Sequence, residues 1–256
     1  MTGATEMRSP RSILITGASS GIGEALARAY AGPGAVLSLS GRNAERLEAV
    51  AAACRRAGAE VDAVTLDVTD AAATVRWVEA RDDARPLDLV IANAGVAGAG
   101  SSGLETTRRI LATNVDGVVN TVSPALARMR RRRSGQIALV SSIAAFRGLP
   151  SAPAYSASKA AVKAWGEALR GRHARDGVAI SVICPGFVTS RMTEGNRFRM
   201  PFLMTADRAA VIIRRGLERD RGRIVFPWPM HAGAWLLAAL PAGLADRVTR
   251  TLPYKE

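Results

Sequence analysis

Short apolar runs alternate with longer segments of helical period through the first 226 residues of the chain. The apolar runs predict strands at residues 12–16, 35–40, 61–66, 87–92, 136–141, 179–183 and 223–226. Segments rich in Ala, Arg and Glu predict helices at residues 21–31, 44–57, 71–80, 105–131, 153–175 and 206–218. Several of the strands are continuously apolar, which is typical of strands covered on both faces. The pattern therefore predicts an α/β fold, with a doubly wound parallel sheet of about seven strands and helices on both faces.

Two segments depart from this alternation. Residues 187–205 form a long, irregular stretch rich in Met, and a loop of that length is typical of a lid over a site. Residues 227–256 are apolar, contain two Trp, and form a predicted appendage to a single domain of residues 1–226. We expect the appendage to pack on that domain, over the substrate site, or at a subunit interface, and peripheral contact with a membrane surface is the alternative.

The charge balance suggests an anionic partner, but its make-up argues against nucleic acid. The chain of 256 residues has a net charge of +13, and 32 of its 35 basic side chains are Arg. They are scattered through every predicted helix, which indicates a bias in residue usage. The one dense cluster, Arg128 and residues 130–133, ends a predicted helix without interleaved aromatic residues, so we expect a solvated helix end and no nucleic-acid partner.

Cysteine usage and hydropathy indicate the compartment. The two Cys, Cys54 and Cys184, form no CxxC motif, which argues against a metal site and against a disulfide framework. The first ten residues contain no apolar stretch, and no run of 18 apolar residues occurs anywhere. We therefore expect a cytoplasmic protein without a bound metal, with peripheral membrane association as the alternative.

A glycine-rich turn joins the first predicted strand to the first predicted helix. It reads Thr16-Gly17-Ala18-Ser19-Ser20-Gly21-Ile22-Gly23. In this context the first Gly permits a tight turn, the second lets the backbone approach a pyrophosphate, and the third lets the helix pack closely on the sheet. The helix N-terminus then offers free N–H groups to the phosphates. The turn therefore predicts a dinucleotide site.

Three further motifs follow in order along the chain. Asn93-Ala94-Gly95 follows the fourth strand, Ser142 precedes Tyr155 and Lys159 at intervals of 13 and four residues, and Pro185-Gly186 follows the sixth strand. With the spacing of the glycine turn, these motifs resemble the short-chain dehydrogenase/reductase family in its compact form, over about residues 10–226. The resemblance implies a Rossmann-type catalytic domain that transfers a hydride between a nicotinamide cofactor and an alcohol or carbonyl group. The alternative is a catalytically silent regulatory or scaffold protein that keeps the fold.

The residues after the second strand predict which nicotinamide cofactor binds. A carboxylate there favours NAD, whereas an Arg pairs with the 2′-phosphate of NADP. This chain has Arg42 and no carboxylate at that place, and Ser40 offers an additional hydroxyl. We therefore predict NADP(H). With the contacts that the resemblance implies, the expected cofactor-binding set is Gly17, Ser19, Ser20, Gly21, Ile22, Gly23, Arg42, Asp67, Val68, Asn93, Ala94, Gly95, Tyr155, Lys159, Pro185, Gly186, Val188 and Ser190. Within it, Ser190 is expected at the nicotinamide carboxamide, with Thr189 as the alternative hydroxyl.

The expected catalytic residues are Asn114, Ser142, Tyr155 and Lys159. Tyr155 and Lys159 share one helix face, and a nearby ammonium favours the phenolate, so Tyr155 is predicted to act as the general acid/base with a lowered pKa. Ser142 would hydrogen-bond the substrate oxygen. The match of Asn114 to the family implies a bound water in a proton relay behind Lys159.

The substrate is predicted only by class. The lid carries Met192, Phe198, Met200, Phe202, Leu203 and Met204, and such soft apolar side chains favour a lipophilic ketone or alcohol. The alternative is that these side chains only pack the lid closed. Arg191, Arg197 and Arg199 lie among them and could meet an anionic group. The resemblance also implies a homo-oligomer, either a dimer or a tetramer.

Overall fold

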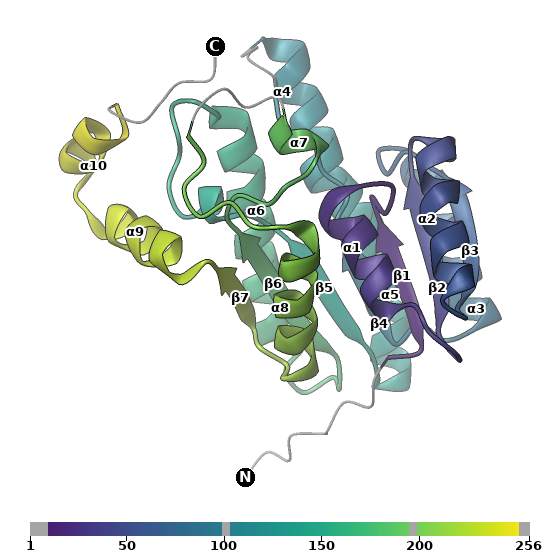
Figure 1. Cartoon of the computed structure of the whole chain (residues 1–256). Helices are drawn as coiled ribbons and strands as arrows, with labels where there is room; N and C mark the ends of the chain where they lie inside the picture. Colours follow the sequence, from purple (N-terminus) through teal and green to yellow (C-terminus); the bar gives the residue numbers. More distant parts are fainter. Residues whose placement is uncertain (1–9, 99–102, 195–198, 251–256) are drawn as a thin grey trace.

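The computed structural model describes residues 10–98, 103–194 and 199–250, and its centre is one parallel sheet (Figure 1). The strands are β1 (Ser12–Thr16), β2 (Val36–Gly41), β3 (Glu60–Thr65), β4 (Leu89–Ala92), β5 (Gln136–Val140), β6 (Ala179–Pro185) and β7 (Arg223–Phe226). They pair in the order β3-β2-β1-β4-β5-β6-β7, and every pairing is parallel. The predicted seven-stranded α/β fold is therefore confirmed.

Helices cover both faces of this sheet (Figure 1). One face packs against α1 (Gly21–Tyr30), α2 (Ala44–Arg56) and α8 (Ala206–Glu218), and the other against α3 (Ala71–Ala84), α5 (Gly117–Arg132) and α6 (Pro153–Arg172). Alternate residues of β1 separate the two cores, because Ile13 and Ile15 belong to the first and Leu14 to the second. Burial on both sides explains why β1 is continuously apolar.

The strand order places a reversal beside β1. The chain adds β2 and β3 on one side of β1, then crosses to β4 on the other side, where Leu14 pairs with Val90. At such a switch point the loops after the two central strands diverge and leave a crevice at the carboxyl ends of the strands. The glycine turn after β1 and the Asn93-Ala94-Gly95 segment after β4 both lie at this crevice.

The helix predicted over residues 105–131 is divided in the structure. It consists of α4 (Leu104–Leu111), a π-helical segment over Ala112–Asp116, and α5. The wider turn carries Thr113 and Asn114, and both side chains are buried. A π-helical turn inside an α-helix often accompanies a functional site, and the period of apolar residues along the sequence gave no sign of it.

The lid base and the C-terminal segment complete the molecule. Val188 and Met204 form a parallel bridge that closes the base of the lid, which includes the short helix α7 (Arg191–Glu194). Two further helices, α9 (Trp228–Ala239) and α10 (Ala242–Thr249), extend beyond the edge strand β7 (Figure 1).

Helix α9 contacts β7 and the 3₁₀ turn Ile143–Ala145, while Trp228 and Trp235 on its outer side are 75% and 61% exposed. Within the described parts of the chain, no helix has both the length and the apolar character needed to span a bilayer. The expected packing of the appendage at an interface or on a membrane stays a prediction.

Candidate active site

A cavity of about 1680 Å³ opens at the carboxyl ends of the strands. Its wall takes residues from the segments that follow β1, β2, β3, β4, β5 and β6, as expected for a switch point. The residues of the expected cofactor-binding and catalytic sets line this cavity, except Gly23 and Asn114. The fold therefore brings together motifs that are far apart in the sequence.

The glycine turn forms the floor of one end of the cavity. Gly17 and Gly21 have φ angles of +67° and +59°, in the left-handed region that favours glycine. A Cβ atom on Gly23 would lie 2.3 Å from the carbonyl oxygen of Gly17, so α1 packs directly against the turn. Ser20 at the N-cap makes no side-chain capping bond, which leaves the first N–H groups of α1 available. This open cradle fits a pyrophosphate at a helix N-terminus.

Asn93 holds the glycine turn in place. Its Nδ2 donates to the carbonyl oxygens of Thr16 and Gly17 at 3.0 and 3.1 Å, and its N–H donates to Thr16 Oγ1 at 3.1 Å. The Ala94 N–H donates to the same hydroxyl at 3.2 Å. Asn93 lines the cavity, as predicted, but its side-chain amide fixes the ends of β1 and β4 to each other.

Two arginines lie where the resemblance places the adenosine ribose. Arg42 Nη1 lies 3.9 Å from Asp67 Oδ2, and the two side chains are 54% and 44% exposed. Arg46 also lines the cavity, and its buried Nε has no hydrogen-bond partner in the described structure. Ser40 is fully buried and does not line the cavity. The prediction that its hydroxyl adds to the cofactor site is therefore wrong. Its side chain alternates toward the sheet interior while the next residues turn into the cavity.

Ser142 and Tyr155 lie at the other end of the cavity. Ser142 follows β5, and its Oγ accepts a hydrogen bond from the Ala144 N–H at 3.1 Å, which fixes the hydroxyl at the start of the 3₁₀ turn. Tyr155 lies in the first turn of α6 and interacts with the Ser142 side chain. Burial raises the pKa of Tyr155, and the Ser142 interaction lowers it by less. This direction is opposite to the lowered pKa predicted from the sequence, because desolvation outweighs the interaction with Ser142.

Lys159 lies one turn beyond Tyr155 on α6 and is buried. Its Nζ donates to the Val140 carbonyl oxygen at 2.9 Å and lies 5.8 Å from the centre of the Tyr155 ring. Burial lowers the pKa of Lys159 to about 8. Desolvation therefore acts on both side chains. It favours a neutral Tyr155 hydroxyl and makes the Lys159 ammonium a stronger acid.

Asn114 lies behind this pair and is fully buried. Its Oδ1 accepts from the Val96 N–H at 2.7 Å, and its Nδ2 donates to the Val96 carbonyl at 2.9 Å and to Ser158 Oγ at 3.0 Å. Its side chain thus joins the segment after β4 to α6. The water relay that the resemblance implied for Asn114 stays a prediction.

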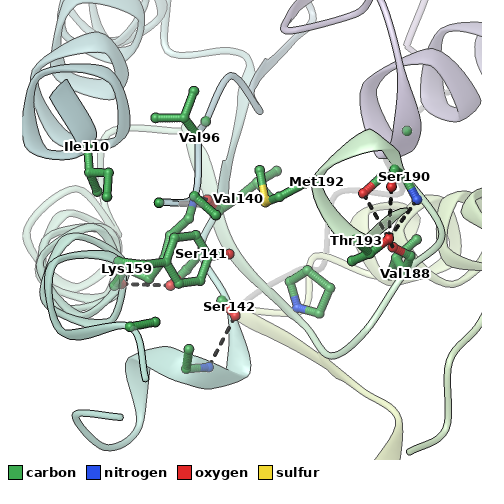
Figure 2. A pocket seen from close by; sticks show the side chains of 18 of the residues that line it. Val96, Ile110, Val140, Ser141, Ser142, Lys159, Val188, Ser190, Met192 and Thr193 are labelled. Carbon is green, nitrogen blue, oxygen red and sulfur yellow. Dashed lines mark hydrogen bonds between the residues drawn. The ribbon is translucent and has the colours of Figure 1, made fainter. Parts of the chain in front are cut away.

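Figure 2 shows the wall opposite Lys159, where Ser190, Thr193 and Val188 form one hydrogen-bonded group. Thr193 Oγ1 donates to the Val188 carbonyl at 2.9 Å, accepts from the Ser190 N–H at 2.9 Å, and lies 3.4 Å from Ser190 Oγ. Thr193 lines the cavity, whereas Thr189, the alternative to Ser190, does not. The sequence argument missed Thr193, because it lies beyond the motif, on the short helix α7.

The substrate end differs from the sequence expectation. Of the apolar lid residues, Met192 lines the cavity and lies between Ser190 and Val140 in Figure 2. Met204 is buried in the core, Phe202 and Leu203 are exposed outside the cavity, and Phe198 and Arg197 lie outside the described residues. Apart from Phe187 of the lid, the apolar wall comes mainly from other elements, through Val96, Ile110, Ile143, Leu149, Met230, Leu237 and Val248.

Among the described residues, no group of three His, Cys, Asp or Glu side chains is arranged to hold a metal ion.

Comparisons with known proteins agree with this geometry. Residues 11–200 match the family model for short chain dehydrogenase. An uncharacterised oxidoreductase of Myxococcus xanthus is 41% identical over 246 residues, which covers 94% of this chain and 97% of the relative.

Two solved structures show the same fold with different cofactors. An alcohol dehydrogenase of Thermococcus sibiricus in complex with 5-hydroxy-NADP is 26% identical, with a TM-score of 0.75 over 84% of this chain and 95% of the other. A Mycobacterium paratuberculosis short chain dehydrogenase bound to NAD is 23% identical, with a TM-score of 0.75 over 86% of this chain and 97% of the other. The chain belongs to the short-chain dehydrogenase/reductase family of oxidoreductases.

Proposed function

We propose that this protein is an NADP(H)-dependent oxidoreductase that interconverts a lipophilic ketone and the corresponding secondary alcohol. The observation that carries the proposal is that Ser142, Tyr155 and Lys159 line one cavity with the glycine cradle. A catalytically silent protein would need none of these side chains to converge, so their convergence supports the enzyme over the scaffold alternative.

Tyr155 is the proton donor in the direction of reduction. Burial raises its pKa, so the hydroxyl keeps its proton at neutral pH and can give it to the oxygen of a bound carbonyl. Ser142 would hold that oxygen by donating its hydroxyl proton to it, since the Ala144 N–H fixes its Oγ and its side chain faces Tyr155. In the reverse direction the Tyr155 oxygen receives the proton of the alcohol.

Lys159 supports Tyr155 from one turn along α6. A pKa of about 8 leaves its ammonium mostly protonated at neutral pH and able to release a proton readily. The bond to the Val140 carbonyl oxygen directs Nζ toward the cavity wall. We assign Lys159 to restoring the Tyr155 proton and to holding the ribose hydroxyls, with Asn114 fixing the surrounding segment.

The residues present fit a nicotinamide dinucleotide. Gly17 and Gly21, with the free N–H groups of α1, would hold the pyrophosphate, and Arg42 with Arg46 would hold the 2′-phosphate. Asp67 and Val68 would border the adenine, while Gly186, Val188 and Ser190 would hold the carboxamide end. When bound, the cofactor supplies or accepts the hydride. The NADP derivative in the Thermococcus sibiricus relative supports this preference, although Asp67 partly offsets the charge of Arg42.

The apolar wall supports a lipophilic substrate. Helix α9 contributes Met230 and Leu237 to it, so the C-terminal segment belongs to the substrate end of the site. We further infer a homo-oligomer, since the exposed Trp228 and Trp235 offer an apolar surface, and a peripheral membrane contact is the competing use of that surface. The buried free thiols of Cys54 and Cys184 support a reducing compartment such as the cytoplasm.

A panel of linear ketones and secondary alcohols, followed by NADPH absorbance, tests the proposal. We expect kcat/KM to rise with chain length, because each added methylene contributes about 0.8 kcal/mol of burial in an apolar wall. Indifference to chain length would contradict the lipophilic substrate. Absence of turnover across the panel, combined with retained NADPH binding, would favour the silent protein instead.

A further inference from the structure

Arg147 lies in the loop between Ser142 and Tyr155 and lines the substrate end of the cavity. It is the second residue after the 3₁₀ turn Ile143–Ala145, and it lines the same cavity as the predicted catalytic hydroxyl groups. Neither the proposed reaction nor the cofactor uses this side chain. A positively charged guanidinium in the cavity of the predicted catalytic residues could bind an anionic group of a ligand.

The neighbouring residues fix the loop that presents Arg147. The Phe146 ring packs edge-on against His231 of α9 at 5.4 Å, and Lys163 and Arg223 lie over the ring at 5.1 and 5.7 Å. On the other side, the Leu149 N–H donates to Ser156 Oγ at 3.2 Å. The backbone is therefore held on both sides of Arg147, which favours a preorganised binding group.

The partner of Arg147 is a single carboxylate on α10. Arg147 Nη2 donates to Asp246 Oδ1 of α10 at 3.2 Å, and the two side chains are 27% and 57% exposed. Within the described structure, the Asp246 carboxylate makes no other ion pair or hydrogen bond. Its backbone carbonyl accepts bonds from Thr249 Oγ1 and the Arg250 N–H at the end of α10. An exposed pair of this kind is weak and exchanges readily with another anion.

The charges around the cavity leave Arg147 available for a ligand. Six arginines and Lys159 line it in the described structure, against one carboxylate, Asp67. Arg42 and Arg46 lie at the adenosine end, and Arg191 borders the glycine cradle as well. Beside Arg147 the wall is apolar, through Ile143, Leu149 and Leu237. The substrate end thus combines an apolar surface with a fixed guanidinium.

We propose that Arg147 binds an anionic oxygen group, a carboxylate or phosphate, carried by the apolar substrate, and that Asp246 occupies Arg147 when the substrate is absent. The planar guanidinium matches such a group with two parallel hydrogen bonds. Binding of the substrate anion would replace the contact between Arg147 and Asp246. Helix α10 would then lose its ion pair with the loop between Ser142 and Tyr155. The proposal rests on the proposed function only in placing the reacting carbonyl near Tyr155.

Equilibrium binding to the full chain, saturated with NADP, tests this directly. The probes are decanoate and monodecyl phosphate, with methyl decanoate as the neutral counterpart, all below their aggregation concentrations. We expect at least one of the two anions to bind about tenfold more tightly than the ester, since a charge-assisted hydrogen bond is roughly twice as strong as a neutral one. Which anion is favoured distinguishes a carboxylate from a phosphate substrate. Equal binding of all three probes would overturn the proposal.

Three variants separate recognition from a structural role. Arg147→Gln should weaken anion binding about tenfold and leave the ester within about twofold. Asp246→Asn should strengthen anion binding about threefold, because it removes the competing carboxylate. Arg55→Gln, which removes the same charge from an exposed pair with Glu48, is the control and should change neither. A loss of anion and ester binding by the same factor in Arg147→Gln, or weaker anion binding in Asp246→Asn, would overturn the proposal.

These measurements do not depend on turnover. Anion preference without ketone reduction would contradict the proposed function and leave the assignment of Arg147 intact. Ketone reduction without anion preference would do the reverse.

Discussion

The side-chain amide of Asn114 hydrogen-bonds both backbone groups of Val96, at 2.7 Å to its N–H and 2.9 Å to its carbonyl. The same amide donates to Ser158 Oγ, which in turn donates to the Tyr155 carbonyl oxygen at 2.7 Å. One buried side chain therefore joins the loop after β4 to the helix that carries Tyr155 and Lys159. The amide provides a donor and an acceptor on two separate atoms, as this pairing requires.

Replacing Asn114 by Ala should lower both stability and kcat. The Val96 N–H and carbonyl would lose their partner in a buried site, which costs about 1–3 kcal/mol for each unsatisfied group. We expect kcat for ketone reduction to fall about tenfold or more, because a small displacement of positioned groups has that effect. Thermal unfolding and steady-state kinetics measure the two effects. Asn120→Ala, which removes a single bond to the Val68 carbonyl, is the control. An unchanged kcat in Asn114→Ala would show that the link does not position Tyr155.

Ketone reduction should lose activity above pH 8. Lys159 has its pKa lowered to about 8 by burial, from an ordinary value of 10.5, so its ammonium is lost as the pH rises through 8. Tyr155 keeps its proton over the same range, since burial raises its pKa. Because Lys159 restores the Tyr155 proton, kcat should fall about tenfold per pH unit beyond that point. A kcat profile from pH 6 to pH 10, with NADPH affinity measured in parallel, tests this. A flat profile would contradict the role of Lys159.

The same shift has a consequence for stability, with the opposite direction. Between pH 8 and pH 10.5 the folded chain holds fewer protons at Lys159 than the unfolded chain does. The contribution of Lys159 to the free energy of unfolding therefore rises with pH between pH 8 and pH 10.5. Below pH 8 the buried ammonium destabilises the folded chain.

The cofactor preference should depend on Arg42 and Asp67 in opposite ways. Arg42→Gln removes a guanidinium that would pair with the 2′-phosphate, so NADPH affinity should fall about tenfold or more, with little change for NADH. Asp67→Asn removes the carboxylate 3.9 Å from Arg42 and should increase the preference for NADPH. Fluorescence titration with NADPH and with NADH measures the ratio of the two dissociation constants. Similar losses for NADPH and NADH in Arg42→Gln would remove Arg42 from phosphate recognition.

NADPH binding should depend on Gly23 of the glycine turn and not on Gly171, which serves as the control. A Cβ on Gly23 would lie 2.3 Å from the Gly17 carbonyl oxygen and 2.5 Å from Asn93 Nδ2, so Gly23→Ala must displace the turn. We expect loss of NADPH binding and a destabilisation of about 1–3 kcal/mol from overpacking. Gly171→Ala on α6 meets no atom within 4 Å and should stabilise the protein by about 0.5–1 kcal/mol. Normal NADPH affinity in Gly23→Ala would contradict the close packing of α1 on the turn.

The sequence predicted the sheet and the glycine turn because both depend on local, repeated signals. Buried strands with a continuous apolar centre, such as Ile13, Leu14 and Ile15 of β1, are covered on both faces, and a turn with φ near +60° at Gly17 and Gly21 tolerates few other residues. The ordered motifs then fixed which loops would meet at the crevice.

Other features escaped because they depend on tertiary packing. The π-helical segment Ala112–Asp116 lies inside an unbroken helical pattern, and only the structure places Asn114 against Val96. Two methionines of the lid look alike in the sequence, so it could not separate Met192, which lines the cavity, from Met204, which packs in the core. Thr193 reaches the cavity through a short helix that no motif marks.

Tyr155 is the proposed proton donor of the reaction, and one variant tests this role most directly. Tyr155→Phe removes the hydroxyl and keeps the ring, so NADPH should bind with unchanged affinity while kcat for ketone reduction falls by about a thousandfold. Tyr30→Phe, which alters a tyrosine that packs against Arg214 away from the cavity, is the control and should retain full activity. Turnover by Tyr155→Phe within about tenfold of the unaltered protein would contradict the mechanism.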